Sequence, residues 1–178
     1  MGIQVPDGYY CREIEEKDLP QLLEMVNWII ANTLSIWRTS PDTLEYRKEW
    51  LKQIKNRYPA IGLFDSSHPD FLIGFASAGP FRLGDGYNKT TECAIACGQE
   101  FTGKGFGRFL IQELLERLKR LEYHVVIAGI SSSNPGSARF FAREGFTRTA
   151  FMPKIGEKNG VLLDLELWQL DLRATGNS

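Results

Sequence analysis

A chain of 178 residues with 43% hydrophobic and 24% charged side chains has the length and composition of one soluble globular domain. The formal net charge of −1 argues against a nucleic-acid-binding protein, which would need a basic face. No apolar run approaches the roughly 18 residues of a membrane span, so we expect no membrane association.

The ends of the chain predict a simple organisation. Met1 to Asp7 does not resemble a signal peptide, and Pro6 stands where the N-myristoylation pattern requires Ser or Thr. We therefore expect a cytoplasmic protein. We also expect a single domain over residues 1–178, with a disordered tail from about Ala174 to Ser178.

The cysteines indicate neither a metal site nor a disulfide framework. Cys11, Cys93 and Cys97 are the three cysteines of the chain, and their spacing matches no ligand motif. Cys93 and Cys97 lie four residues apart on an expected strand, and we interpret both as small buried hydrophobic residues. We expect no metal cofactor.

Apolar spacing and turn residues define the elements of the first half. A capping hydroxyl, a proline and an early acidic residue in Ser40-Pro41-Asp42 predict a helix start. The expected elements are a strand at Tyr9–Ile14, a helix that begins at Asp18 and carries an apolar stripe to Ile30, a helix from Ser40 to about Asn56, strands at Ala60–Phe64 and Phe71–Ala78, a loop at Gly79–Lys89 and a strand at Thr90–Cys97.

The second half continues the alternation of strands and helices, which predicts an α/β fold with a mixed sheet. Proline at the first helical position and Gly145 after the last one bound the shorter helix. The expected elements are a helix from Gly105 to about Leu121, a strand at Val125–Gly129, a helix from Asn134 to Gly145 and strands at Phe146–Phe151 and Val161–Leu170.

A glycine loop between the strand Thr90–Cys97 and the following helix is the most informative feature. Gly103, Gly105 and Gly107 stand at alternate positions before a helix N-terminus, where converging N–H groups and the helix dipole favour a phosphate or pyrophosphate. A glycine-rich turn without a ligand is the alternative. The loop lacks the Gly-Lys-Ser/Thr of a P-loop. A dinucleotide fold would also need a second unit and an acidic residue at the end of the next strand, and Ile127 to Ile130 contains none. Nucleotide-bearing coenzymes that bind without these features remain as candidate ligands, and coenzyme A is one of them.

Two polar residues flank this loop in sequence. Glu92 lies on the strand just before it, where a carboxylate can act on the group that the ligand carries. Asn134 precedes Pro135, so it is either an ordinary helix N-cap or a residue that also contacts a pantetheine amide. The local sequence leaves both interpretations of Asn134 open.

The run from Thr102 to Gly107, followed by Asn134, Ala138 and Gly145-Phe146, resembles the GNAT superfamily of N-acetyltransferases. Within it, the chain is similar to the phosphinothricin and methionine sulfoximine N-acetyltransferase family. Further matching segments include Gly79 to Arg82, Gly86-Tyr87, Val126 to Ile130, Gly156 to Lys158 and Asp164-Leu165.

The resemblance implies the GNAT fold, in which helices flank a mixed, mostly antiparallel sheet whose strands 4 and 5 are splayed. It also implies a homodimer, for which Trp28, Trp37, Trp50 and Trp168 are candidate interface residues, with burial inside the monomer as the alternative. The implied activity is transfer of an acetyl group from acetyl-CoA to the α-amino group of a small amino-acid analogue.

Roles for single residues follow from the same resemblance. The end of the strand before the loop is expected to bind pantetheine through its backbone, and one N–H group there can stabilise the oxyanion by roughly 3 kcal/mol. The glycine loop is expected to hold the pyrophosphate. The coenzyme-binding residues are then Ile95, Ala96, Cys97, Gly103, Lys104, Gly105, Phe106, Gly107, Arg108 and Asn134.

Glu92 matches the residue that serves as general base, which must take a proton from the substrate ammonium before it attacks the thioester. Arg82 would bind a substrate carboxylate in a bidentate manner, and Tyr87 would line the acceptor pocket. The plainer alternatives are a solvated carboxylate at a strand end, a surface arginine and a tyrosine that only packs its loop.

The chain departs from the family at two positions. Thr102 stands where the glycine loop usually begins with Gln or Arg, which puts one side-chain contact to the pyrophosphate in doubt. Phe141 stands where Tyr or His is found near the departing sulfur, and phenylalanine cannot protonate a thiolate. Because a thiol of pKa about 8.5 is a tolerable leaving group, this change is compatible with an enzyme.

The best hypothesis is direct attack of the amine on acetyl-CoA in a ternary complex, without an acyl-enzyme. One alternative is an acetyltransferase that modifies a protein or peptide. The other is a non-catalytic module that senses acetyl-CoA, which the loss of a Tyr or His at Phe141 favours and the presence of Glu92 opposes.

Overall fold

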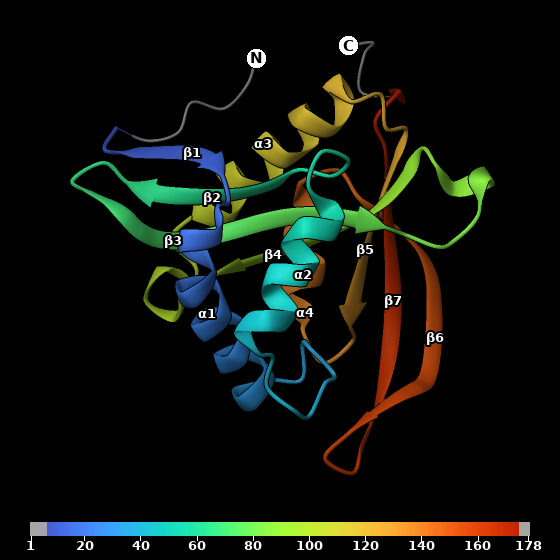
Figure 1. Ribbon diagram of the computed structural model, residues 1–178. Coiled ribbons are helices and arrows are strands. Elements are labelled where there is room, and N and C mark those ends of the chain that lie inside the picture. The colour runs from blue at the N-terminus through green and yellow to red at the C-terminus, as the bar shows by residue number, and fades with distance from the viewer. Residues whose placement is uncertain (1–6, 175–178) are drawn as a thin grey trace. The chain divides into compact units, whose positions relative to one another are not determined.

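The computed structural model describes residues 7–174 (Figure 1). The N-terminal features discussed above, and the expected tail beyond Ala174, lie outside the described residues. No helix within the described range is long and apolar enough to cross a membrane. The main elements are β1 (Tyr9–Glu13), α1 (Leu19–Asn32), α2 (Leu44–Ile54), β2 (Ala60–Asp65), β3 (His68–Pro80), β4 (Thr90–Cys97), α3 (Phe106–Arg120), β5 (Val125–Ser131), α4 (Pro135–Arg143), β6 (Thr147–Lys158) and β7 (Val161–Asp171).

The sheet has seven strands in the order β1-β2-β3-β4-β5-β7-β6. Antiparallel pairing joins β1 to β2, β2 to β3, β5 to β7 and β6 to β7. β4 and β5 are parallel, with Thr90–Glu92 opposite Val125–Ile127 at the start of both strands. The predicted α/β fold with a mixed, mostly antiparallel sheet is confirmed.

The chain forms two compact units, and it passes from one to the other within α1 and within β4. The first unit contains the chain up to Val26, Asp42–Gly79 and Ala94–Glu122. The second unit contains Asn27–Pro41, Pro80–Cys93 and the chain from Tyr123 onward. Strands β1 to β3 and helix α3 therefore belong to the first unit, and β5, β6, β7 and α4 to the second.

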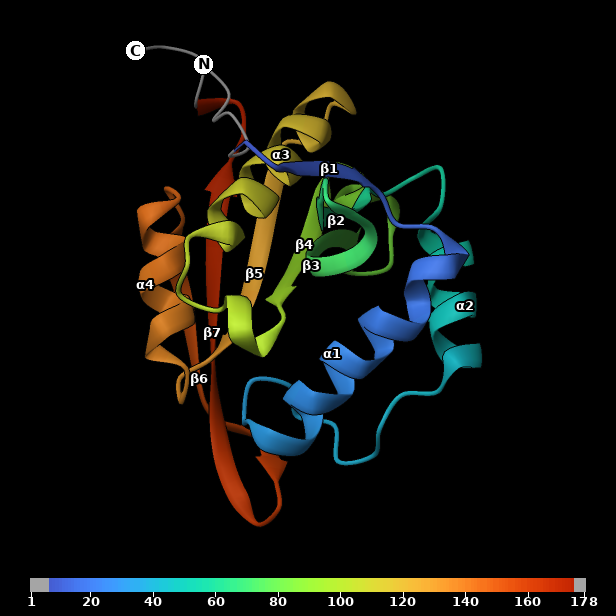
Figure 2. The ribbon, with the colours of Figure 1, turned by 90° about the vertical axis from the view of Figure 1, so that its left-hand side faces the viewer.

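Helix α3 supplies much of the core of the first unit. Its apolar residues recur at helical spacing and lie against β2 and beside β1 (Figures 1 and 2). Leu110, Ile111, Leu114 and Leu118 are all 0% exposed. Each buried side chain of this size contributes about 1.5–3 kcal/mol, so this one face anchors the helix.

The second unit is built on the long hairpin of β6 and β7 (Figure 1). Helix α4 contacts β5 and β6. Three phenylalanines join α4 to the start of β6. Phe141 makes edge-to-face contacts with Phe140 and with Phe146, at ring-centroid distances of 5.2 and 5.0 Å. Phe141 is thereby buried, as expected for a core residue.

The start of α2 was predicted at Ser40, and the structure corrects it to Leu44. Thr43 is the N-cap, and its hydroxyl accepts a hydrogen bond of 3.1 Å from the N–H of Tyr46. Asp42 and Arg47 form a buried ion pair of 2.5 Å across the first turn. These two interactions select the later helix start over the competing signal at Ser40-Pro41.

Two strands, β3 and β6, extend beyond a predicted end by three or more residues. β3 begins at His68 rather than Phe71, because His68 pairs with Asp65 in a tight hairpin. β6 continues past Phe151 to Lys158, where it pairs with Val161 of β7. Hairpin pairing thus extends strands through residues whose local sequence indicates turns.

The core position of α3 leads to a prediction for stability. We expect Leu114→Ala to lower the free energy of unfolding by about 3 kcal/mol, since it removes buried methyl groups and leaves a cavity. Leu121→Ala is the matched control, because Leu121 caps the same helix and is 49% exposed. Its cost should stay within about 0.5 kcal/mol. Urea unfolding measures both, and equal costs would contradict this account of α3.

Candidate active site

The predicted site residues are distributed over both units. Ile95 to Cys97 and Gly103 to Arg108 belong to the first unit. Glu92, Asn134 and the loop with Arg82 and Tyr87 belong to the second. β4 carries residues of both groups, with Glu92 near its start and Cys97 at its end.

In the first unit, the end of β4 lies against β3. A side chain at Gly74 of β3 would place its Cβ 2.7 Å from the carbonyl oxygen of Ala96 and 2.9 Å from Sγ of Cys97. The N–H of Gly98 donates a 2.8 Å hydrogen bond to the carbonyl of Ile73. Glycine at position 74 therefore lets the two backbones approach closely. The hydrogen bond from Gly98 then holds the end of β4 against β3.

The thiols on β4 are poor nucleophiles. Burial raises the pKa of Cys93 to about 12 and that of Cys97 to about 11, so both stay protonated at neutral pH. Cys93 is buried as predicted, whereas Cys97 is half-buried because it stands at the strand end. This protonation supports the expectation that no cysteine carries the acyl group.

The glycine loop requires glycine for its backbone conformation. Gly103 has φ +78° and Gly105 has φ +87°, values that residues other than glycine rarely adopt. A Cβ at either position would meet no atom within 4 Å, so crowding is not the reason. The loop thus bends through two left-handed residues and leaves open space around them.

The N-terminus of α3 has the properties of an anion site. Gly105 is the N-cap and offers no side chain, so the first N–H groups of the helix, from Phe106 and Gly107, keep their hydrogen-bonding capacity. Phe106 is buried against Tyr9 and contributes only its backbone. Lys104 is exposed beside the turn. Backbone donors, helix dipole and a cation all favour a phosphate here.

The structure clarifies the departure at Thr102. Its hydroxyl donates to the carbonyl oxygen of Gly98 at 3.3 Å, within the loop itself. Thr102 therefore closes the turn after β4, where the family's Gln or Arg was expected to reach the pyrophosphate. The backbone N–H groups at the start of α3 do not depend on this side chain.

In the second unit, Glu92 carries a carboxylate with a perturbed pKa. Part of the side chain is open to solvent, but protein atoms fill much of the volume around it, and this loss of hydration raises the pKa. Across residues 7–174 the structure records no hydrogen bond or ion pair for this carboxylate. A carboxylate with these properties is suited to accept a proton.

Gly129 of β5 makes room for Glu92. A Cβ at this position would lie 3.0 Å from Oε1 of Glu92 and 3.7 Å from Cδ1 of Leu165. Gly129 pairs with Leu167 of β7, so its backbone cannot move aside easily. Sequence reasoning missed this role, although glycine inside a buried strand signals a close approach.

The loop before β4 presents Arg82 beside an aromatic pair. Phe81 and Tyr87 make an edge-to-face contact at 5.8 Å, and the guanidinium of Arg82 lies 5.2 Å from the Phe81 ring centroid. Among the described residues no ion pair is recorded for Arg82, which is exposed. This exposure leaves its guanidinium open to an anion from solvent, and the predicted contact with a substrate carboxylate stays a prediction.

Asn134 is the N-cap of α4, which confirms one of its two interpretations. Its Oδ1 accepts a 3.0 Å hydrogen bond from the N–H of Ser137. Its Nδ2 donates a second bond of 2.9 Å to Oγ of Ser35. The sequence did not predict this second bond, because the two residues lie 99 positions apart.

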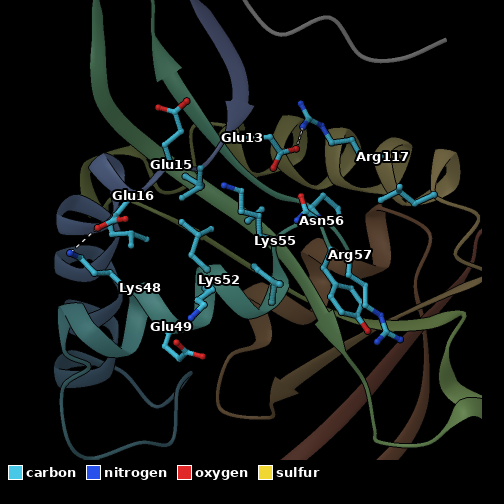
Figure 3. A pocket seen from close by; sticks show the side chains of 18 of the residues that line it. Glu13, Glu15, Glu16, Lys48, Glu49, Lys52, Lys55, Asn56, Arg57 and Arg117 are labelled. Atoms are coloured by element: carbon cyan, nitrogen blue, oxygen red, sulfur yellow. Dashed lines mark hydrogen bonds and ion pairs between the residues drawn. The ribbon is translucent and has the colours of Figure 1, made fainter.

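A cavity of about 1090 Å³ lies elsewhere in the first unit, between the end of β1, α2 and the end of α3 (Figure 3). None of the predicted site residues lines it. Charged side chains at its rim are partly paired, as in Lys48 with Glu16 at 2.8 Å and Arg117 with Glu13.

Residues 7–174 contain no group of three or more His, Cys, Asp or Glu placed to hold a metal ion.

Comparisons with known proteins agree with this geometry. The model of the acetyltransferase (GNAT) family matches residues 22–146. An L-methionine sulfoximine/L-methionine sulfone acetyltransferase of Pseudomonas paraeruginosa is 34% identical over 92% of this chain and 95% of its own length.

Two solved structures are similar over nearly the whole chain. A phosphinothricin acetyltransferase from Sinorhizobium meliloti, in complex with acetyl-CoA, has a TM-score of 0.87 and 26% identity, covering 96% of this chain and 94% of its own. A ribosomal-protein-alanine N-acetyltransferase from Brucella melitensis has a TM-score of 0.85 and 34% identity, covering 91% and 99%. With the family model matching more than half of its residues, the chain belongs to the GNAT family of acetyltransferases.

Proposed function

We propose that this acetyltransferase moves an acetyl group from acetyl-CoA to the amino group of a small amino-acid-like substrate, of the phosphinothricin or methionine sulfoximine type. The observation that carries the proposal is the Glu92 carboxylate, which is unpaired among the described residues and has a raised pKa beside Gly129. The curated relative of this chain that is named for methionine sulfoximine supports the substrate class.

The residues of the first unit fit the coenzyme. When bound, acetyl-CoA supplies an activated thioester. The N–H groups at the start of α3 and the open turn at Gly103 and Gly105 would hold its pyrophosphate, with Lys104 and Arg108 as nearby cations. The backbone of Ile95 to Cys97 would pair with the pantetheine arm, and Asn134 would contact the same arm.

Glu92 takes the proton of the substrate ammonium, directly or through a water molecule. Its raised pKa brings it closer to neutrality and makes it a stronger base than an ordinary glutamate. Phe141 is buried among phenylalanines and supplies no proton, so the chain offers a base without a matching acid at that position.

Arg82 and Tyr87 would define the acceptor. An exposed guanidinium held beside Phe81 can form two parallel hydrogen bonds with a substrate carboxylate. The resemblance to a ribosomal-protein-alanine N-acetyltransferase favours a protein N-terminus as the second candidate acceptor. A sensor without activity is the remaining alternative, and Glu92 opposes it.

We also propose a homodimer of single-domain subunits in the cytoplasm. β6 is an edge strand, and the β6–β7 hairpin exposes apolar side chains that a second copy would cover. These side chains are Phe151, Ile155, Val161 and Leu162, which are 46–55% exposed. Of the proposed interface tryptophans, Trp28 is exposed and the other three are half-buried. The three free cysteines fit a reducing compartment.

The proposed function is tested by release of free CoA thiol from acetyl-CoA in the presence of different amines. The panel contains methionine sulfoximine, methionine sulfone, phosphinothricin, ordinary amino acids, polyamines and peptides that begin with alanine. We expect turnover with the amino-acid analogues. Turnover with the peptides alone would select the protein acetyltransferase, and binding of acetyl-CoA without turnover on any amine would select the sensor.

For Glu92→Gln we expect a loss of about 100-fold or more in kcat, with affinity for acetyl-CoA nearly unchanged, because only the base is removed. The pKa of Glu92 is raised, so wild-type kcat/KM should fall as the pH drops through that pKa and the carboxylate becomes protonated. This fall of kcat/KM at acidic pH should be absent in Glu92→Gln.

Glu24→Gln is the matched control for this experiment, since Glu24 is an exposed carboxylate on α1. It should leave rate and pH profile as in the wild type. Unchanged turnover in Glu92→Gln, or a loss of acetyl-CoA affinity in step with turnover, would show that Glu92 is not the base.

For Arg82→Ala we expect KM for amino-acid acceptors to rise about tenfold, since a charge-assisted bidentate contact is lost. Acetylation of an amine without a carboxylate should change little. Arg143→Ala, at the exposed end of α4, is the control. Equal losses toward both kinds of acceptor would contradict the carboxylate contact.

A further inference from the structure

Lys158, the last residue of β6, is a buried cation whose ammonium is fully hydrogen-bonded. Its side chain is 2% exposed. Nζ donates to the carbonyl oxygens of Ile30, Thr33 and Ile36, at 2.8 Å for Thr33 and 2.7 Å for Ile36. An ammonium has three hydrogens, so all of its donors are used. Burial of such a charge is tolerated only with this degree of satisfaction.

The acceptors lie at the end of α1 and just beyond it. α1 ends at Asn32, where the last carbonyl groups of a helix lack partners and carry the negative end of its dipole. Lys158 satisfies one carbonyl in the last turn, from Ile30, and two beyond the helix, from Thr33 and Ile36. The ammonium therefore caps α1 and fixes the irregular segment that follows it. We name Thr33–Trp37 the clasp segment.

Two further contacts fix the clasp segment in the second unit. The ring of Trp37 lies directly on Gly156 of β6, where a Cβ would come within 2.2 Å of a ring carbon. The hydroxyl of Ser35 accepts the 2.9 Å hydrogen bond from Nδ2 of Asn134. β6 therefore supports the segment at two points, Gly156 and Lys158, and the segment in turn reaches Asn134.

Two contacts orient the Asn134 amide, one with Ser137 and one with Ser35. Oδ1 points to the N–H of Ser137, and Nδ2 points to Ser35. A primary amide has two N–H donors and two acceptor lone pairs. One donor and one lone pair therefore remain, which matches the donor and acceptor of a pantetheine amide. Without Ser35 in place, only the N-cap bond from Ser137 would restrain the amide of the half-exposed Asn134 side chain.

We propose that Lys158 is a positioning residue for the coenzyme: it fixes the clasp segment so that Ser35 holds the Asn134 amide in the orientation that binds the pantetheine arm. The proposal rests on the proposed function, in which Asn134 contacts acetyl-CoA. It assigns a function to a lysine that lies far from Asn134 in sequence and does not contact it.

The test is the dissociation constant of acetyl-CoA, measured by calorimetry without an acceptor. Lys158→Met keeps an unbranched side chain, one atom shorter, and removes the ammonium. We expect affinity to fall about tenfold, with kcat at saturating acetyl-CoA changed less than about twofold. Lys154→Met, an exposed lysine on the same strand, should bind as the wild type does. Because binding is measured directly, the result is independent of whether any tested amine is acetylated.

A double-mutant cycle separates positioning from general loss of structure. Asn134→Ser replaces the amide by a hydroxyl that can still act as the N-cap of α4. In this background, Lys158→Met should weaken acetyl-CoA binding no further. Wild-type affinity in Lys158→Met, or a full additional loss in the double variant, would overturn the proposal.

Ser35→Ala covers the case in which Lys158→Met does not fold. Ser35 is exposed, and its removal leaves the ammonium contacts in place. We expect acetyl-CoA to bind about threefold more weakly, with the loss absent when Asn134 is already serine. An unchanged affinity in Ser35→Ala would equally overturn the proposal.

Discussion

Burial of one face of α3 is the interaction on which the rest of the first unit depends. Four fully buried aliphatic side chains hold the helix against β2, while a glycine N-cap leaves its first N–H groups without side-chain partners. The strong apolar contact outweighs the weak cap, since glycine at the N-cap costs only about a few tenths of a kcal/mol relative to a capping side chain. A free helix N-terminus can thus be kept in a stable position and offered to an anionic ligand.

Most of the fold could be predicted from local pattern. Helical spacing identified α1 and α3, and the Asn134-Pro135 start of α4 was correct because the cap residue and the proline act locally. The predicted element ends were wrong where residues distant in sequence determine where a helix or strand begins or ends. The Asp42–Arg47 ion pair moved the start of α2, and pairing with β7 carried β6 through Met152-Pro153 to Lys158. Such partners have no signature in a short window of sequence.

The candidate site was predictable in its residue types and less so in its environment. The glycine loop, Glu92 and Asn134 follow from motif and resemblance. The raised pKa of Glu92 and the space that Gly129 leaves for it depend on neighbours from other strands. Lys158 was the least predictable, because a lysine before Asn159-Gly160 is typical of a solvated turn, and only the tertiary structure brings it to the end of α1.

The protonated state of the cysteines has a consequence for redox behaviour. Thiolates are the nucleophiles that attack peroxides and other electrophiles, and a thiol of pKa about 11 is ionised in only about one molecule in ten thousand at pH 7. Cys11 and Cys97 are therefore slow to oxidise even though each is only half-buried, and Cys93 is better protected. Oxidation of these thiols is therefore a slow route to damage of this fold.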